Sequence, residues 1–183
     1  MLLKQNPLWE YKKEKNSPVV VAHLFKDNSF LHVRFQVSEP ENCYASFIRQ
    51  DGDHAWEDSC VEIFVQALDN PNEYINFEFT SKAFCYAARG RDRFHRKEFL
   101  RNRYSRILRS ATAPVFQNGT VSWEIHVSIP AQLLGAENLA GEEIFGNLYK
   151  CADRALAPHY LTLFPISTER PDFHQPRFFQ KLL

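Results

Sequence analysis

Two short segments of alternating character constrain the fold of this chain more than any other feature. In residues 61–66 and 74–79, every second residue is apolar: Val61, Ile63 and Val65 in the first, and Ile75, Phe77 and Phe79 in the second. A repeat of two residues matches a β-strand, whose side chains point alternately to its two faces. Asn and Pro residues between the segments favour a turn. We therefore predict two strands joined by a turn, each with one apolar face.

Aromatic and acidic residues accompany this pair of strands. Trp56 precedes the first strand, and Glu62 and Glu78 lie on the faces opposite the apolar ones. A ring can stack on the apolar face of a small polyhydroxylated ligand, while carboxylates accept hydrogen bonds from its hydroxyl groups. The opposing interpretation is that Trp56 caps the core and that both glutamates are solvated residues on the outer face of a sheet.

The remainder of the chain repeats the strand pattern at short intervals. Residues 29–37 and 120–130 alternate most clearly, and residues 130–135, with Pro at the start and Gly at the end, predict one helical turn. Shorter strands are predicted at 17–24, 43–48, 84–88, 112–116, 144–152 and 159–164, and the last twenty residues are predicted to form an arm that ends in a short apolar strand. Roughly eight to ten short strands with almost no helix predict an all-β, antiparallel β-sandwich.

Size and charge narrow the class of protein. A chain of 183 residues with 44% apolar and 24% charged residues is expected to form a single domain over residues 1–183. The formal net charge is zero, so the whole chain gives no indication of a nucleic-acid or membrane partner. The first residues, MLLKQNPLWEYKK, contain a Lys-rich leader without the apolar segment of a signal peptide. We expect either a cytosolic protein or a sequence that begins after a removed signal.

Residues 89–109 differ from the rest in charge. They contain nine basic residues against Asp92 and Glu98, and we expect a long exposed loop that enters a strand in its second half. Aromatic residues between the arginines would suit a polyanion, such as single-stranded nucleic acid or an acidic polysaccharide. The alternative is a solvated loop with no ligand.

Cysteine and histidine spacing does not predict a metal site. Cys43, Cys60, Cys85 and Cys151 form no CxxC pair, and the seven histidines show no HxH or HExxH pattern. The expectation for the cysteines is buried free thiols, with one disulfide left open. No metal ligand and no cofactor is predicted from the residues themselves.

Four segments in order resemble a known family. They are WEDSCVEIFV (56–65), EYINFEF (73–79), WEIHVSIP (123–130), and FGNLYKC (145–151) with the Pro-rich end PDFHQPRFF (171–179). The order is similar to the family 9 carbohydrate-binding modules, and more closely to the family 9-like single-domain proteins of gut bacteria such as Bacteroides. The resemblance implies a jelly-roll-like sandwich that binds carbohydrate without catalysis, in glycan catabolism. It also implies a structural calcium ion, whose ligands do not map onto this sequence.

The resemblance also implies the site residues. A terminal sugar unit would be held between two aromatic rings, with Trp56 in the place of the first ring and Phe173 in the place of a second ring that is normally Trp. Glu62 matches an acidic contact, Glu78 stands where the family uses Arg, Tyr149 where it uses an amide, and Arg170 lies near an Asn position. Phe173 keeps an apolar plane but loses area and the indole N–H, so a weaker grip is expected.

Three functions follow as hypotheses. The first is binding of a mono- or oligosaccharide, which is acidic if the Arg-rich segment contributes. The second is a glycoside hydrolase, or a fragment of one, that uses Glu62 and Glu78, because such enzymes need two carboxylates beside the scissile bond. The third is an interaction module that binds a polyanion through residues 89–109, or a scaffold without a ligand site.

Overall fold

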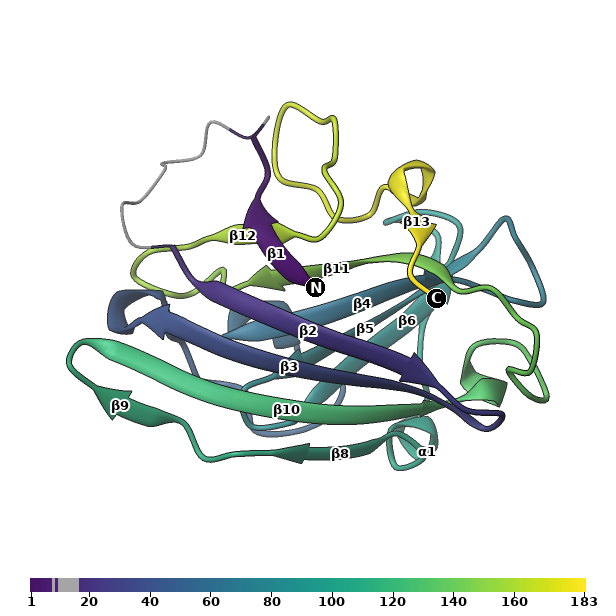
Figure 1. The fold of residues 1–183 in the computed structure, drawn as a ribbon, viewed down its shortest axis with the longest axis horizontal. Helices are drawn as coiled ribbons and strands as arrows, with labels where there is room; N and C mark the ends of the chain where they lie inside the picture. Colours follow the sequence, from purple (N-terminus) through teal and green to yellow (C-terminus); the bar gives the residue numbers. More distant parts are fainter. Residues whose placement is uncertain (8, 10–16) are drawn as a thin grey trace.

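The computed structural model describes residues 1–7, 9 and 17–183 and consists mainly of antiparallel strands (Figure 1). The Lys-rich leader predicted from the sequence falls largely outside these residues. Two sheets are stacked, and strand β1 (Leu2–Gln5) belongs to both because it pairs with one strand of each. The predicted all-β sandwich is therefore confirmed. In the described part of the chain, no helix is both long and apolar enough to cross a membrane.

The first sheet, called the β3 sheet, is built on the longest strands. Its strands are β2 (Val19–Lys26), β3 (Phe30–Pro40), β10 (Thr120–Pro130), β8 (Leu108–Ala111) and β9 (Val115–Gln117). β3 and β10 pair along their whole length, with Phe35 opposite Ile125. The alternation predicted for residues 120–130 agrees with the bounds of β10, and the short helix η3 (Ala131–Leu133) follows it as expected.

The second sheet, called the β4 sheet, contains the two alternating segments. Its strands are β7 (Arg96–Glu98), β6 (Cys85–Gly90), β5 (Tyr74–Thr80), β4 (Cys60–Gln66), β11 (Phe145–Cys151) and β12 (Tyr160–Thr162), and β13 (Gln180–Lys181) also pairs with β11. In β4 and β5, Val61 lies opposite Phe79 and Ile63 opposite Phe77. These residues pack with the apolar face of the β3 sheet to form the main core.

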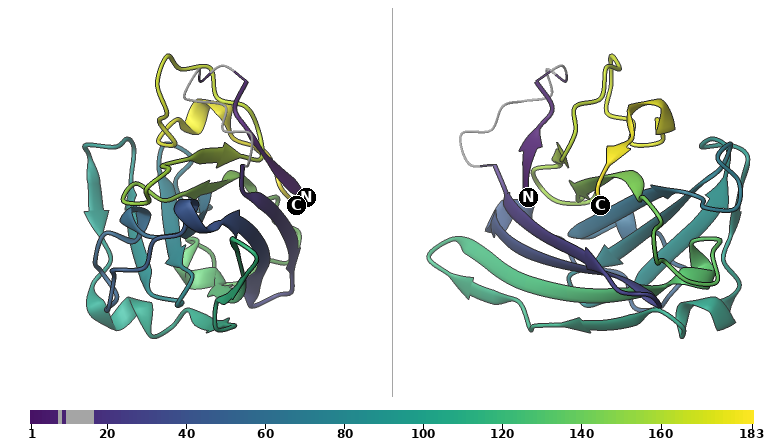
Figure 2. Two further views of the ribbon diagram at one scale, coloured as in Figure 1. Left: turned by 90° about the vertical axis from the view of Figure 1, so that its left-hand side faces the viewer. Right: turned by 45° about the vertical axis from the view of Figure 1, so that its right-hand side comes forward.

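The outer face of the β4 sheet is covered rather than solvated. The C-terminal segment, yellow in Figures 1 and 2, lies on the side of the molecule away from β3 and β10. Ile166 and Phe173 from this segment, together with Trp9, form a second apolar cluster with Phe64 and Tyr149 of the sheet. β4 and β5 are therefore buried on both faces, which a two-residue alternation does not reveal.

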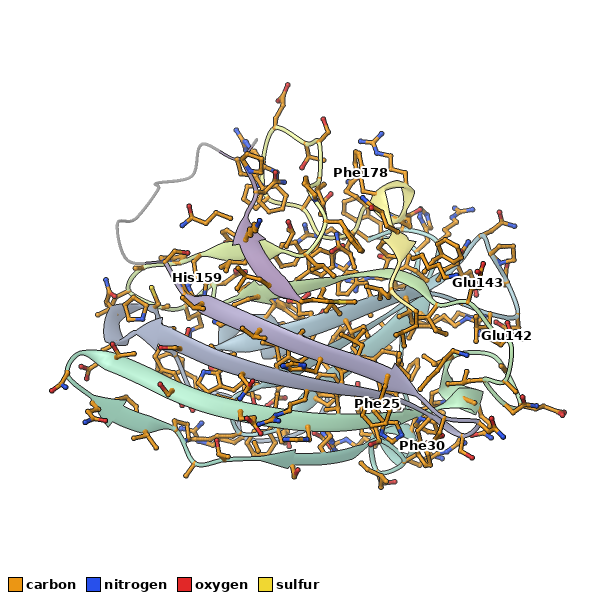
Figure 3. All side chains as sticks on the ribbon, in the orientation of Figure 1. Phe25, Phe30, Glu142, Glu143, His159 and Phe178 are labelled. Carbon is orange, nitrogen blue, oxygen red and sulfur yellow. The ribbon has the colours of Figure 1, made fainter. Side chains whose placement is uncertain are left out.

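A buried ion pair links the two sheets. Lys150 Nζ of β11 lies 2.8 Å from Glu39 Oε2 of β3, and both side chains are fully buried. The indole Nε1 of Trp123 donates a hydrogen bond to Glu39 Oε1 (2.7 Å). His159, labelled in Figure 3, lies 2.7 Å from Lys150 Nζ, and burial followed by the charge of Lys150 lowers its pKa to about 2. This network fixes β3, β10 and β11 relative to one another.

Three predicted strands need correction. Residues 43–48 form no strand: Cys43 ends the short helix η1 (Glu41–Cys43), and the N–H groups of Phe47 and Ile48 donate to the carboxylate of Asp58 instead of to a neighbouring strand. The strand predicted at 112–116 is β9, which begins only at Val115. The last strand, Gln180–Lys181, is polar and exposed rather than apolar.

The Arg-rich segment is more structured than an exposed loop. It contains part of β6, β7, the single helical turn α1 (Arg101–Tyr104) and the start of β8. Tyr104 and Ile107 are buried in the main core. Arg109 makes a two-pronged contact with Asp51, at 2.7 and 2.8 Å, and Arg89 binds both Asp69 and Glu73. The arginines at the two ends of the segment therefore join elements of the fold.

Candidate functional site

A cavity of about 200 Å³ opens between the outer face of the β4 sheet and the C-terminal segment. It is lined by Trp56, Glu62, Glu78, Arg93, Arg96, Cys151, Asp153, Tyr160, Pro171, Asp172, Phe173 and His174. Four of the six residues predicted for the site thus line one cavity, although they come from distant parts of the sequence. The other two, Tyr149 and Arg170, are not among its lining residues.

Trp56 is held at the cavity by the short helix η2 (Ala55–Glu57). One face of its indole stacks on His54, with ring centroids 4.4 Å apart and planes inclined by 19°, and its ring meets Tyr86 edge to face at 5.2 Å. The Trp56 carbonyl accepts a hydrogen bond from the Asp153 N–H (3.0 Å). The side chain is half-buried. It therefore packs against the second apolar cluster and leaves part of its surface open at the cavity.

Phe173 is positioned by residues beneath it and beside it. Its ring lies parallel to that of Tyr149, with centroids 4.2 Å apart and an interplanar angle of 7°. The Tyr149 hydroxyl donates to the Phe173 carbonyl (3.2 Å), and Trp9 and Tyr160 contact the ring from other sides. Phe173 is only 9% exposed. Tyr149 therefore supports the cavity wall from below.

The segment that carries Phe173 is tied to the N-terminus. Asn6 donates from its amide to the carbonyl of Ile166 (2.6 Å), and the Trp9 indole donates to the hydroxyl of Thr168 (3.0 Å). The same threonine hydroxyl donates to the Arg170 carbonyl (2.8 Å), while the Arg170 side chain is exposed. Phe178, labelled in Figure 3, packs on the cluster from η4 (Pro176–Phe178).

Glu62 and Glu78 form a pair of carboxylates at the cavity. They are directly opposite each other on β4 and β5, with exposed fractions of 2% and 3%. The interpretation of both as solvated surface residues is wrong, because the C-terminal segment covers this face. Burial raises the pKa of Glu78 to about 8, and burial followed by the neighbouring Cys151 and Glu78 raises the pKa of Glu62 well above its ordinary value.

Each of these carboxylates has one identified donor. The Cys151 thiol donates to Glu62 Oε1 (3.0 Å), and the Asn76 amide donates to Glu78 Oε1 (2.9 Å). The same Asn76 accepts a hydrogen bond from Arg96 Nη1 (2.8 Å). The carboxylates are thus held in place by neutral donors, with one arginine linked to Glu78 through an amide.

Several lining residues were not predicted from the sequence. Arg93 and Arg96 come from the Arg-rich segment. The sequence showed the charge of this segment but not its position beside the cavity. Asp153 accepts a hydrogen bond from the Tyr160 hydroxyl (3.0 Å), and burial raises its pKa. Asp172 and His174 are the sequence neighbours of Phe173. Their position next to a predicted site residue was the signal in the sequence that could have identified them.

One group of side chains approaches the geometry of a metal site. A sulfur atom of Cys60, a sulfur atom of Cys151 and a carboxylate oxygen of Glu62 lie within 4.8 Å of one another, all buried. Calcium takes six to eight oxygen ligands, so this sulfur-rich set does not fit the calcium ion that the resemblance implies. Burial also raises the pKa of both thiols, which opposes the thiolate form that metals bind. All four cysteines are buried free thiols.

Comparisons with known proteins identify a family for this chain and one similar solved structure. The family model described as carbohydrate-binding family 9 matches residues 6–183. The structure is similar to a crystal structure of a Bacteroides uniformis protein to which carbohydrate binding has been ascribed, with a TM-score of 0.86 and 28% sequence identity. That likeness covers 98% of this chain and 83% of the other. No curated protein matches the chain.

Proposed function

Because the chain belongs to carbohydrate-binding family 9, we propose that the cavity binds one sugar unit without catalysis. Trp56 is the platform on which the apolar face of the sugar stacks, and Phe173 is the second aromatic wall. Glu62, Glu78 and the other polar lining groups bind the sugar hydroxyls. The protein would serve glycan catabolism by recognising a carbohydrate that other proteins degrade.

The observation that carries this proposal is that Trp56 and Phe173 line the same cavity. Each ring already has one face occupied, Trp56 by His54 and Phe173 by Tyr149. The surface that each ring offers to the cavity therefore belongs to its other face or to its edge. Rings fixed in this way lose little conformational entropy when a ligand stacks on them.

The size of the cavity favours a small ligand. Its volume of about 200 Å³ is below the roughly 300–1,000 Å³ of sites that take drug-sized ligands. A single sugar unit, either free or at the end of a chain, is the carbohydrate that suits such a space. Few contacts imply weak binding, with a dissociation constant in the micromolar to millimolar range, or roughly 4–8 kcal/mol.

One observation favours a glycoside hydrolase as the second candidate. A pKa of about 8 for Glu78 suits a general acid at neutral pH. However, Glu62 and Glu78 are cross-strand neighbours on one face, whereas glycosidases place their two carboxylates on either side of the scissile bond. Membership of a binding family supports the first candidate.

The acidic-sugar variant of the proposal is less well supported. Arg89 and Arg109 are engaged by carboxylates of the fold, so they offer no free charge to a ligand. Arg93 and Arg96 line the cavity, but acidic residues accompany them there. The arginines at the two ends of the segment are therefore committed to the fold, and the two that line the cavity have acidic neighbours there.

Calorimetric titration with a panel of monosaccharides tests the proposal. Wild-type protein should bind at least one member, and Trp56→Ala should bind it at least tenfold more weakly while melting as a folded protein. Phe25→Ala is the matched control, because Phe25 is an exposed aromatic residue of β2 that does not line the cavity. Equal loss in both variants, or none in Trp56→Ala, would refute the assignment of the platform.

A further inference from the structure

The cavity carries more acidic than basic side chains. Its acidic lining residues are Glu62, Glu78, Asp153 and Asp172, and its basic lining residues are Arg93 and Arg96. His174 adds no charge at neutral pH, because burial followed by the two arginines lowers its pKa to about 3. Burial raises the pKa of Glu62, Glu78 and Asp153, so the neutral form of these carboxyls is favoured while the cavity holds no cation.

Each of the two arginines already has a polar partner. Arg93 Nη1 lies 3.6 Å from Asp172 Oδ1, and Arg96 Nη1 donates to the amide oxygen of Asn76. The amide nitrogen of Asn76 in turn donates to Glu78 Oε1. The two positive charges are therefore directed to other groups of the protein, and within the described residues no guanidinium group pairs directly with Glu62 or Glu78.

One carboxylate oxygen at the cavity has no donor. Glu78 Oε2 is buried and makes no hydrogen bond within residues 1–7, 9 and 17–183. An ionised carboxylate is an acceptor only, and a buried acceptor without a donor is unfavourable. A ligand in the cavity that supplies a donor would remove this penalty.

We propose that the cavity recognises a sugar unit that carries a protonated amino group, bound against Glu78 with Glu62 beside it. This inference rests on the proposed function and specifies its ligand class. An ammonium group brings three donors and one positive charge, so it satisfies Glu78 Oε2 and stabilises the ionised form of this carboxyl. A uronic acid would add a further carboxylate to the same space, and a neutral sugar would supply a hydrogen-bond donor without the positive charge.

The ionisation of the two glutamates is consistent with such a ligand. Burial raises the pKa of Glu78 to about 8 and that of Glu62 well above its ordinary value, so each anion is disfavoured in the ligand-free protein. A positive charge within about 4–6 Å favours the ionised carboxylate. Binding of an ammonium group therefore stabilises the ionised carboxylates that burial disfavours. A hydroxyl group stabilises them to a smaller extent.

Three matched sugar pairs test the inference: glucose with glucosamine, galactose with galactosamine, and mannose with mannosamine. Each pair differs by one hydroxyl replaced by an amino group. Calorimetry at about pH 6.5 keeps comparable amines protonated, because they titrate at about 7.7–8.0. In the pair that binds best, the amino sugar should bind at least about tenfold more tightly, as expected for a hydrogen bond to a charged group. Glucuronic acid should bind more weakly than glucose.

Variants assign the preference to the glutamate. Glu78→Gln keeps the size of the side chain and should reduce the ratio of amino-sugar to neutral-sugar affinity toward one. Asp153→Asn provides a second variant if Glu78→Gln does not fold, and it should lower the same ratio. Glu142→Gln is the matched control, because Glu142 is exposed on the β10–β11 connection and is not a lining residue (Figure 3). Its ratio should equal that of the wild type.

The outcomes separate this inference from the proposed function. If neutral sugars bind and amino sugars bind no more tightly, or if glucuronic acid binds best, the inference is wrong and the sugar site stands. If no member of any pair binds, the sugar site is wrong and the inference falls with it. A preference that survives in both Glu78→Gln and Asp153→Asn also overturns the role of the acidic groups.

Discussion

The ring of Tyr149 lies parallel to that of Phe173, with centroids 4.2 Å apart, and its hydroxyl donates to the Phe173 carbonyl. A fully buried residue of the sheet thus determines where an aromatic wall of the cavity stands. The resemblance placed Tyr149 among the ligand contacts, but the structure places it beneath Phe173, a residue of the cavity wall, and not among the lining residues.

Two substitutions at Tyr149 separate its ring from its hydroxyl. Tyr149→Phe keeps the stacked ring and loses one hydrogen bond, so unfolding should become easier by about 0.5–1.5 kcal/mol and sugar affinity should change little. Tyr149→Ala removes a buried aromatic ring, which costs about 3–5 kcal/mol, and should also weaken sugar binding because Phe173 loses its support. Urea unfolding and calorimetry measure both effects. A folded Tyr149→Ala protein with wild-type affinity would contradict the supporting role.

Removing one member of the buried pair Lys150 and Glu39 is predicted to destabilise the fold more than neutralising both. Lys150→Met leaves the carboxylate of Glu39 buried without its cation and should destabilise the fold by about 3–5 kcal/mol. Adding Glu39→Gln to Lys150→Met should recover part of this loss, because the uncompensated charge is removed. Urea unfolding at neutral pH measures both variants. A single substitution that costs less than about 1 kcal/mol would show that the pair does not hold the sheets together.

Glu78 should make the fold less stable as pH rises. Its folded pKa, about 8, is above its ordinary value of 4.5, so between these values the folded protein binds more protons than the unfolded chain. Stability linked to this group is therefore present below about pH 4.5 and is lost as pH rises through about 8. Glu78→Gln should gain stability over the wild type across this window, by up to a few kcal/mol.

The surroundings of Glu78 define the control for this pH dependence. The titratable or charged groups that interact with it come from several strands and loops, and they are Cys60, Glu62, Tyr74, Cys85, Tyr86, Arg93, Arg96 and Asp153. The titration of Glu62 is coupled to that of Glu78, so the difference in melting temperature between Glu78→Gln and wild type from pH 4 to pH 9 reports on this pair of carboxyls. If the difference in melting temperature does not grow with pH, the pKa of Glu78 is not raised in the folded protein.

Glycoside hydrolysis should not be detectable. Glu62 and Glu78 lie side by side on adjacent strands, so they are not placed on the two sides of a scissile bond. A panel of aryl glycosides should release no more phenol with wild-type protein than with Glu62→Gln. Turnover that depends on Glu62 would establish the hydrolase instead of the binding protein.

The sequence predicted the framework because alternation is a local signal. Residues 61–66, 74–79 and 120–130 carry the two-residue repeat throughout, and each became a strand of the main sandwich. Residues 43–48 show where this signal fails: an apolar stretch satisfied its N–H groups with the carboxylate of Asp58 rather than with a strand. Local pattern does not indicate which partner a backbone group will find.

The site was only partly predictable because it depends on a long-range contact. Trp56, Glu62 and Glu78 follow from the strands and the resemblance, but the burial of both glutamates requires the C-terminal segment to cover their face. Arg96 was noted only for its charge, and its link to Glu78 through Asn76 depends on the pairing of β5, β6 and β7. Such contacts are set by tertiary structure and leave no periodicity in the chain.

A crystal structure of the protein with the tightest-binding monosaccharide tests the central claim most directly. The account predicts a pyranose in the cavity, with its apolar face on Trp56, Phe173 as the second wall, and a donor group of the sugar within hydrogen-bond distance of Glu78 Oε2. A sugar bound elsewhere on the molecule, or in this cavity without contact to Trp56, would contradict it.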